Sequence, residues 1–160
     1  MFWRRTLALA GALLLWIPAL LWAAGRRWLD RRQCRPLTDA QHQLAQRLGI
    51  RLPDRVRLCP MPTRLFPLPA SLARWLQRGG IPAGSAIGLA LGHVIYLRTL
   101  PPDRDLLRHE LVHVRQVERC RGLPWFLLIY LWQCLAHGYH AAPMEREARG
   151  EPGPWSNVPR

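Results

Sequence analysis

The hydrophobic pattern of the chain starts with an uninterrupted apolar run near the amino terminus. Residues 7–24 carry no charge, and arginines flank them on both sides. Eighteen such residues are just long enough to cross a bilayer as a helix. The tryptophans in and around the run are distributed as interfacial anchors are, at Trp3, Trp16, Trp22 and Trp28. We therefore predict that residues 1–29 form a single-pass membrane anchor.

The flanks of this run bear on its processing and its direction. Ala23 and Gly25 fit the small-residue pattern of a signal-peptide cleavage site, but the run is long and two arginines would follow the cut. A retained anchor is therefore favoured over a cleaved signal. Arginines are more numerous after the run than before it, which by the positive-inside rule would place the following domain in the cytoplasm. The Arg4-Arg5 start is equally typical of an exported domain, so both orientations stay open.

Beyond residue 30 the pattern alternates between short helical and short strand segments. Thr38 and Gln41 have the spacing of a capping box, and Gly49 provides the stop for the helix that this box opens. Alternating apolar residues and the positions of proline and glycine predict the other elements. These are strands at 55–59, 86–91 and 94–97, a proline-rich loop at 60–69 and a short helix at 71–77.

The strongest helical periodicity covers residues 103–121. Pro101 and Asp103 provide the start of this helix and Gly122 provides the stop. At about 100° per residue the segment has an apolar stripe, an arginine stripe and a third face that carries two histidines. The stripes consist of Leu107, Leu111 and Val114, and of Arg108, Arg115 and Arg119, and the third face holds His109, His113, Gln116 and Cys120.

Two further helices are expected near the carboxyl end. Residues 124–136 are almost entirely apolar but too few for an unaided membrane span, so we predict a buried or interfacial helix packed over the preceding one. Residues 144–149 form a short helix in which Glu145 and Ala148 share an apolar side that docks on the core. Glu147 is about 200° away from Glu145 and is expected on the solvent side.

The length of the chain suits one small domain. We expect a single α+β domain over residues 30–150, between the anchor and a loose tail at 151–160. The net charge of +13 comes from arginine alone, since the chain contains no lysine. A basic surface suits anionic lipid headgroups or nucleic acid. The arginines are scattered and follow no nucleic-acid-binding motif, so binding to nucleic acid is not expected.

The four cysteines show no zinc-finger spacing. Cys34, Cys59, Cys120 and Cys134 contain no CxxC pair and suit either disulfides in an oxidising compartment or free buried thiols. Cys120 lies seven residues after His113, which is about 10 Å along a helix and too far to share one metal ion. We expect Cys120 in the core.

Candidate chemistry enters with the sequence His-Glu-Leu-Val-His at residues 109–113. His109 and His113 are one helical turn apart on the same face, so both imidazoles can reach one Zn²⁺. Glu110 lies between this face and the apolar stripe, where it can handle the proton of a metal-activated water. The rival interpretation of Glu110 is a buried salt bridge. We predict a zinc site with both histidines as ligands and Glu110 as the general base.

A catalytic zinc usually has three protein ligands and one open position. Glu145 and Glu147 are the main candidates for the third ligand, and only one of them can face the metal. The side of the short helix that docks on the core is the side of Glu145, so Glu145 is the predicted ligand. His137 and His140 are the weaker alternatives.

These residues resemble the gluzincin-type HExxH zinc metallopeptidases over roughly 86–149. Residues 88–116 are similar to the strand and motif helix of that group, and residues 145–148 have the Glu-x-x-Ala pattern of its glutamate helix. The resemblance is strongest to small uncharacterised bacterial proteins with a hydrophobic amino terminus, which implies a bacterial inner membrane. It also implies a zincin-like fold, with the same ligands and base as above. Several such families have an aspartate turned toward a ligand histidine where this chain has Arg149.

The expected protein is a minimal zincin-like α+β domain, with a small sheet, a motif helix and a glutamate helix, behind an amino-terminal transmembrane helix. Its expected function is hydrolysis of a peptide or protein substrate, with Zn²⁺ as cofactor. Tyr130, Tyr139 and His140 are the candidates for stabilising the oxyanion. Two alternatives stay open. One is a non-catalytic zinc-binding structural or regulatory module at the membrane, and the other is a basic membrane-surface protein with a chance motif.

Overall fold

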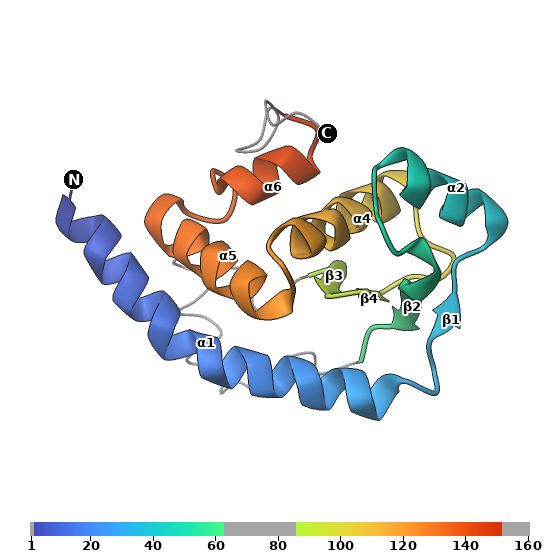
Figure 1. The fold of residues 1–160 in the computed structure, drawn as a ribbon, viewed down its shortest axis with the longest axis horizontal. Coiled ribbons are helices and arrows are strands. Elements are labelled where there is room, and N and C mark those ends of the chain that lie inside the picture. Colours follow the sequence, from blue (N-terminus) through green and yellow to red (C-terminus); the bar gives the residue numbers. More distant parts are fainter. Residues whose placement is uncertain (1, 63–85, 152–160) are drawn as a thin grey trace.

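The computed structural model describes residues 2–62 and 86–151, and the architecture of these residues is α+β (Figure 1). A small mixed sheet packs against helices, and the first helix is long and apolar. The expected fold class is therefore confirmed at the level of α+β. The short helix expected at 71–77, most of the loop at 60–69 and the tail from 152 onward lie outside the described residues.

Four short strands form the described sheet in the order β1-β2-β4-β3. They are β1 (Arg35–Pro36), β2 (Arg57–Pro60), β3 (Gly88–Leu91) and β4 (Val94–Leu97). β2 and β4 are parallel, whereas β1 pairs with β2 and β3 pairs with β4 in the antiparallel direction. Gly92 makes the turn between β3 and β4 at φ +71°, an angle that glycine adopts without strain. β3 is thus the last strand on one edge of the described sheet.

The strand expected at 55–59 is shifted toward the carboxyl end. Its first residue belongs to a 3₁₀ turn, η1 (Pro53–Arg55), so β2 begins two residues later. The pattern places Pro60 after the strand, but Pro60 pairs with Leu97 as the last residue of β2. The next backbone N–H, that of Met61, donates to the Leu97 carbonyl at 2.9 Å, so the proline costs the sheet no hydrogen bond there.

Helices α2 (Asp39–Arg47) and α4 (Arg104–Arg119) begin at side-chain caps. Both hydrogen bonds of the capping box between Thr38 and Gln41 are present, as predicted. Asp103 accepts hydrogen bonds from two backbone N–H groups in the first turn of α4. The motif helix therefore starts where the sequence predicts, and its position along the chain is fixed by its cap.

The sheet separates two hydrophobic clusters, because successive strand residues point to opposite faces. On one face the strands pack against α2 and α4, and the predicted stripe of Leu107, Leu111 and Val114 is buried there. On the other face Tyr96 of β4 shares a second cluster with Ala23 of the amino-terminal helix. The amino-terminal helix is therefore part of the core of the domain.

α5 (Leu123–His137) lies between α1 (Phe2–Asp30) and the pair α4 and α6 (Pro143–Ala148), and it contacts all three (Figure 1). This confirms the expected helix packed over the motif helix. α4 and α6 also contact each other. These contacts bring together the two helices that carry the candidate metal ligands.

α1 is long and apolar enough to cross a membrane over Thr6–Asp30, by length and composition. Signal sequences share this length and composition, so the anchor stays a prediction. The helix contains Pro18 and curves along one side of the domain (Figure 1). Shortly after α1 ends, Cys34 forms a disulfide with Cys59 of β2, whereas the other two cysteines are free thiols. The disulfide thereby ties the connection between α1 and β1 to the sheet.

Candidate metal centre

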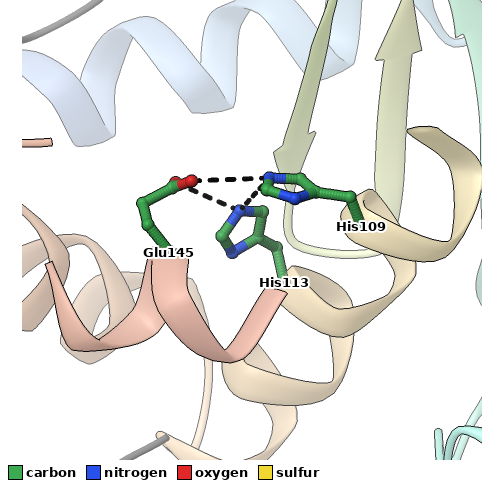
Figure 2. Close-up of side chains that lie close together, drawn as sticks. All are labelled: His109, His113 and Glu145. Carbon is green, nitrogen blue, oxygen red and sulfur yellow. Dashed lines mark hydrogen bonds and ion pairs between the residues drawn. The ribbon is translucent and has the colours of Figure 1, made fainter. Parts of the chain in front are cut away.

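The two motif histidines meet on one side of α4. Their Nε2 atoms are 3.1 Å apart, and the ring planes are at 82° with their centres 4.8 Å apart (Figure 2). Residues four apart on a helix lie one above the other, which brings both imidazoles to the same place. His113 is buried and His109 is partly exposed. One side of the group therefore stays open.

Glu145 of α6 completes this group. Its carboxylate oxygens lie 3.5 Å from Nε2 of His109 and 3.2 Å from Nε2 of His113 (Figure 2). One ligand atom from each residue falls within 4.8 Å of the other two, so the group could hold a metal ion. Glu145 is only 1% exposed although it is a carboxylate. The structure thus brings together the three residues that the sequence predicts as ligands.

Two carboxylate oxygens near this point lack hydrogen-bond partners in the described part of the chain. They are Oε2 of Glu145 and Oε2 of Glu110, and both are buried. His109 reaches Oε2 of Glu145 at ion-pair distance and does not form a hydrogen bond with it. A buried oxygen without a donor is costly unless another cation balances it. Two imidazole nitrogens and a carboxylate oxygen also match the ligands that Zn²⁺ prefers, so the residues fit this ion.

Two hydrogen bonds to the backbone of α6 set the position of this short helix. Gln133 of α5 accepts from the N–H of Met144 at 2.9 Å, and Gln116 of α4 donates to the carbonyl of Met144 at 3.0 Å. Met144 and Ala148 are fully buried, as expected for the apolar side of the helix. Because the neighbouring residue is held from two helices, the carboxylate of Glu145 is directed at the histidines.

Glu147 is buried in an ion-pair cluster, and the prediction that it lies on the solvent side is wrong. It is 8% exposed and accepts hydrogen bonds from Arg115 at 2.8 Å, Arg119 at 3.0 Å and Gln116 at 2.8 Å. Rotation about the helix axis does separate it from Glu145. Both sides of α6 are nevertheless packed against other parts of the domain, because this helix lies against α4 and its arginine stripe.

Gln116 connects this cluster to the metal centre. Its Oε1 lies 2.9 Å from Nδ1 of His113, while its Nε2 donates to Glu147 and to the carbonyl of Met144. Since the amide nitrogen is committed to two acceptors, the amide oxygen is the atom that accepts the Nδ1 proton of His113. This tautomer leaves the lone pair of Nε2 directed at the candidate metal position.

Arg149 stands where several families that the sequence resembles have an aspartate turned toward a ligand histidine. Its hydrogen bonds go to residues outside the metal centre. Its guanidinium donates to the backbone oxygen of His140 and to the carboxylate of Glu151. The orienting role that the resemblance gives to an aspartate is filled here from α4 by Gln116. The sequence contained a signal for this, because Gln116 follows His113 by three residues and shares its helical face.

Glu110 is buried against β3 beside the metal centre. A Cβ at Gly88 would lie 2.9 Å from the carboxyl carbon of Glu110, so the absence of a side chain there makes room for this carboxylate. Burial raises the pKa of Glu110, although the neighbouring His113 and His109 oppose that shift. Its Oε2 has no hydrogen-bond partner among the described residues, which speaks against the rival salt-bridge interpretation. A carboxyl group with a raised pKa and an oxygen that lacks a hydrogen-bond partner suits proton transfer.

The protonation states of His113 and Glu145 depend on one another. Burial disfavours protonated His113, but the hydrogen bond and the charge of Glu145 outweigh it and raise the pKa of His113 to about 9. Burial alone would raise the pKa of Glu145, but the adjacent imidazoles of His109 and His113 hold it well below its usual range. At neutral pH the metal-free group therefore holds a proton on His113, and a binding metal ion must displace it.

A cleft of about 510 Å³ opens beside the group, between the start of β3, the start of α4 and the segment that joins α5 to α6. Tyr139 and His140, two of the three oxyanion candidates, line it. The third, Tyr130, donates its hydroxyl to Oε1 of Glu145 at 2.6 Å, and burial raises its pKa well above the usual value. Tyr130 therefore orients the ligand carboxylate, and the other two face the cleft.

The weaker alternatives for the third ligand lie outside the group. His137 and His140 are both exposed, and the cluster of described residues that could hold a metal ion contains neither of them. In comparisons with known proteins, no family model, curated protein or solved structure matches the chain. The functional interpretation therefore rests on the residues of the site and their geometry.

Proposed function

We propose that this protein is a zinc-dependent peptidase that acts at a membrane. The observation that supports this best is the group of His109, His113 and Glu145, with the buried Glu110 beside it and a cleft in front. Three protein ligands leave one position of a tetrahedral zinc open, which is typical of catalytic sites and not of structural ones. The gluzincin resemblance of the sequence favours the same reaction.

The residues around the group have complementary roles in peptide hydrolysis. Bound Zn²⁺ supplies Lewis acidity and lowers the pKa of water in the site. Glu110 takes the proton of the attacking water and returns it to the leaving amine. Tyr130 and Gln116 hold Glu145 and His113 in place, and Tyr139 and His140 are the candidate donors to the carbonyl oxygen as it gains negative charge.

The form of the cleft supports a peptide as the substrate. Ala86, Ile87 and Gly88, at the start of β3, line one wall, and β3 is the last strand on that edge of the described sheet. An extended peptide can add to such an edge through backbone hydrogen bonds while its side chains enter pockets. A volume of about 510 Å³ is in the range that binding sites for small ligands and peptide side chains occupy.

α1 is, in this proposal, retained and attaches the domain to a membrane. A cut after Gly25 would remove Ala23, which is fully buried in one cluster with Leu91 and Tyr96. Removing it would expose apolar surface of the domain, which is costly. A retained α1 provides the membrane attachment, in the bacterial inner membrane that the resemblance implies.

The alternative is a non-catalytic zinc module with a structural or regulatory role. It would use the same three ligands and the same contacts of Gln116. Glu110 distinguishes the two functions, because a structural zinc site needs no buried carboxylate beside the metal whose oxygen lacks a hydrogen-bond partner. The observed position of Glu110 favours the peptidase.

Glu110→Gln in the full chain tests the proposal. The amide has nearly the same shape but cannot take the proton, so hydrolysis of a quenched fluorescent peptide library should fall by several orders of magnitude. Zinc content and thermal stability should stay at the wild-type level. Glu151→Gln, at an exposed ion pair, is the matched control and should keep full activity. Unchanged hydrolysis by Glu110→Gln would overturn the proposed base. Hydrolysis by neither variant nor wild type would favour the zinc module.

A further inference from the structure

α1 runs along one side of the domain (Figure 1). In its first half, a Cβ at Gly11 would lie 3.2 Å from Leu135 of α5, and the indole N–H of Trp16 donates to the carbonyl of Pro124 at 2.7 Å. In its second half, Ala23 is buried in the cluster that covers one face of the sheet. The domain therefore contacts one side of α1 at points from Gly11 to Ala23.

The carboxyl end of α1 is fastened to the domain as well. Asp30 is buried and forms an ion pair with Arg26 one turn earlier. The sulfur of Cys34 lies 3.2 Å from the carbonyl oxygen of Asp30, and the same atom is joined to Cys59 of β2 by the disulfide. These contacts hold the carboxyl end of α1 close to β2.

The opposite side of α1 is apolar and exposed. Leu7, Leu14, Leu21 and Trp28 recur every seven residues and are 70%, 78%, 71% and 63% exposed. A seven-residue repeat returns to nearly the same side of a helix, so these four side chains and Ile17 form one stripe, the membrane stripe. The buried residues Ala8, Ala12, Ala23 and Asp30 lie about half a turn away from it. Such a continuous apolar surface marks a contact with a partner or a membrane.

A spanning orientation does not suit this arrangement. A helix that crosses the bilayer needs lipid along about 20 residues. α5 packs against α1 and the sheet meets α1 near Ala23, so these parts of the domain would have to enter the bilayer with it. The next layer, α4, carries Arg115 and Arg119, which are ion-paired with Glu147. Charged side chains at that depth are strongly disfavoured.

We propose that α1 lies in the plane of an anionic bilayer, with the membrane stripe in the acyl region and both of its ends on the same side. The positive charge near the carboxyl end of α1 supports an anionic bilayer as the partner of this surface. Arg31 and Arg32 are exposed just beyond the end of the stripe, and the guanidinium of Arg31 lies over the ring of Trp28 at 5.3 Å. Arginine beside tryptophan at the edge of an apolar face matches anionic headgroups above an acyl layer.

Trp125 of α5 is also exposed, and its ring lies 6.5 Å from that of Trp16 on the side of α1 that faces α5. The membrane is therefore expected on the side of α1 that faces away from α5 and the sheet. This disposition refines the membrane attachment proposed above and does not depend on peptidase activity. It also predicts that the cleft works on the same side of the membrane as the amino terminus.

The sidedness of the two chain ends tests this proposal. The full chain would carry one epitope tag at each terminus in sealed right-side-out and inverted membrane vesicles, and an external protease would be added. In-plane attachment predicts that both tags are digested in one preparation and both are protected in the other. Digestion of one tag with protection of the other, in both preparations, would establish a spanning helix and overturn the proposal.

A second measurement tests whether the membrane stripe binds a lipid bilayer. The double variant Leu14→Arg, Leu21→Arg should bind phosphatidylcholine–phosphatidylglycerol vesicles at least tenfold more weakly than wild type, while keeping its zinc content. Leu52→Arg is the control, because it places one arginine at an exposed leucine outside α1. Equal vesicle binding by the double variant and the control would overturn the proposal. A wild-type protein that forms a dimer through α1 and does not bind vesicles would also overturn the proposal.

Discussion

Removal of the carboxylate of Glu147 should destabilise the fold, because this side chain joins α6 to α4. It is 8% exposed and accepts hydrogen bonds from Arg115, Arg119 and Gln116 at 2.8–3.0 Å. Hydrogen bonds to charged groups contribute about 1.5–3 kcal/mol each, and breaking a buried ion pair costs about 3–5 kcal/mol. The two arginines are 19% and 34% exposed, so water can solvate them after the change. We therefore expect Glu147→Ala to lower the free energy of unfolding by about 3 kcal/mol.

Thermal unfolding of the full chain in mild detergent measures this effect. For a chain of this size the loss corresponds to a decrease in Tm of about 6–12 °C. Glu151→Ala is the control, since Glu151 is 44% exposed and forms its ion pairs at the surface with Arg146 and Arg149. Its Tm should equal that of wild type. A decrease for Glu147→Ala that is no larger than the decrease for this control would refute the reasoning.

Three further predictions follow from the geometry of the site. Gly88→Ala should abolish hydrolysis and Gly25→Ala should not, because a Cβ at Gly88 meets the Glu110 carboxyl group whereas nothing lies within 4 Å of one at Gly25. Activity assays on both variants check this. Gln116→Ala should weaken zinc binding about 10–100-fold in chelator competition, because the His113 ring loses its orienting partner. Zinc affinity should rise with pH up to about 9, since the raised pKa of His113 means that a proton must leave first. The raised pKa of His113 also stabilises the metal-free fold at pH values below about 6.5. This contribution should be lost as the pH rises to about 9. Affinity and metal-free stability that do not vary with pH would contradict this pKa.

The parts of the site that lie within one helix could be predicted from the sequence. His109 and His113 share a face because four residues make about one turn, and Glu110 falls beside that face for the same reason. Glu145 could also be predicted, because the apolar side of its helix had to dock on the core. In each case a local periodicity decided the position of the side chain.

The parts that depend on how helices pack could not be predicted in this way. Glu147 is buried because both sides of α6 meet protein, which no rotation about one helix axis reveals. Gln116 carried a positional signal, but its role depends on the backbone of Met144 lying next to it. The disulfide between Cys34 and Cys59 joins segments that only β-sheet pairing brings together. The apolar amino-terminal run predicted a helix, whereas its contacts along the domain are tertiary.

The metal content of the purified full chain tests the central claim most directly. The protein should be prepared without a metal-affinity tag, incubated with zinc, dialysed and measured by atomic emission together with His113→Ala. The geometry of His109, His113 and Glu145 predicts about one tightly held zinc ion per folded wild-type chain and none in the variant. A well-folded wild-type chain without zinc, or a variant that retains the ion, would contradict the claim that these three residues form a metal centre.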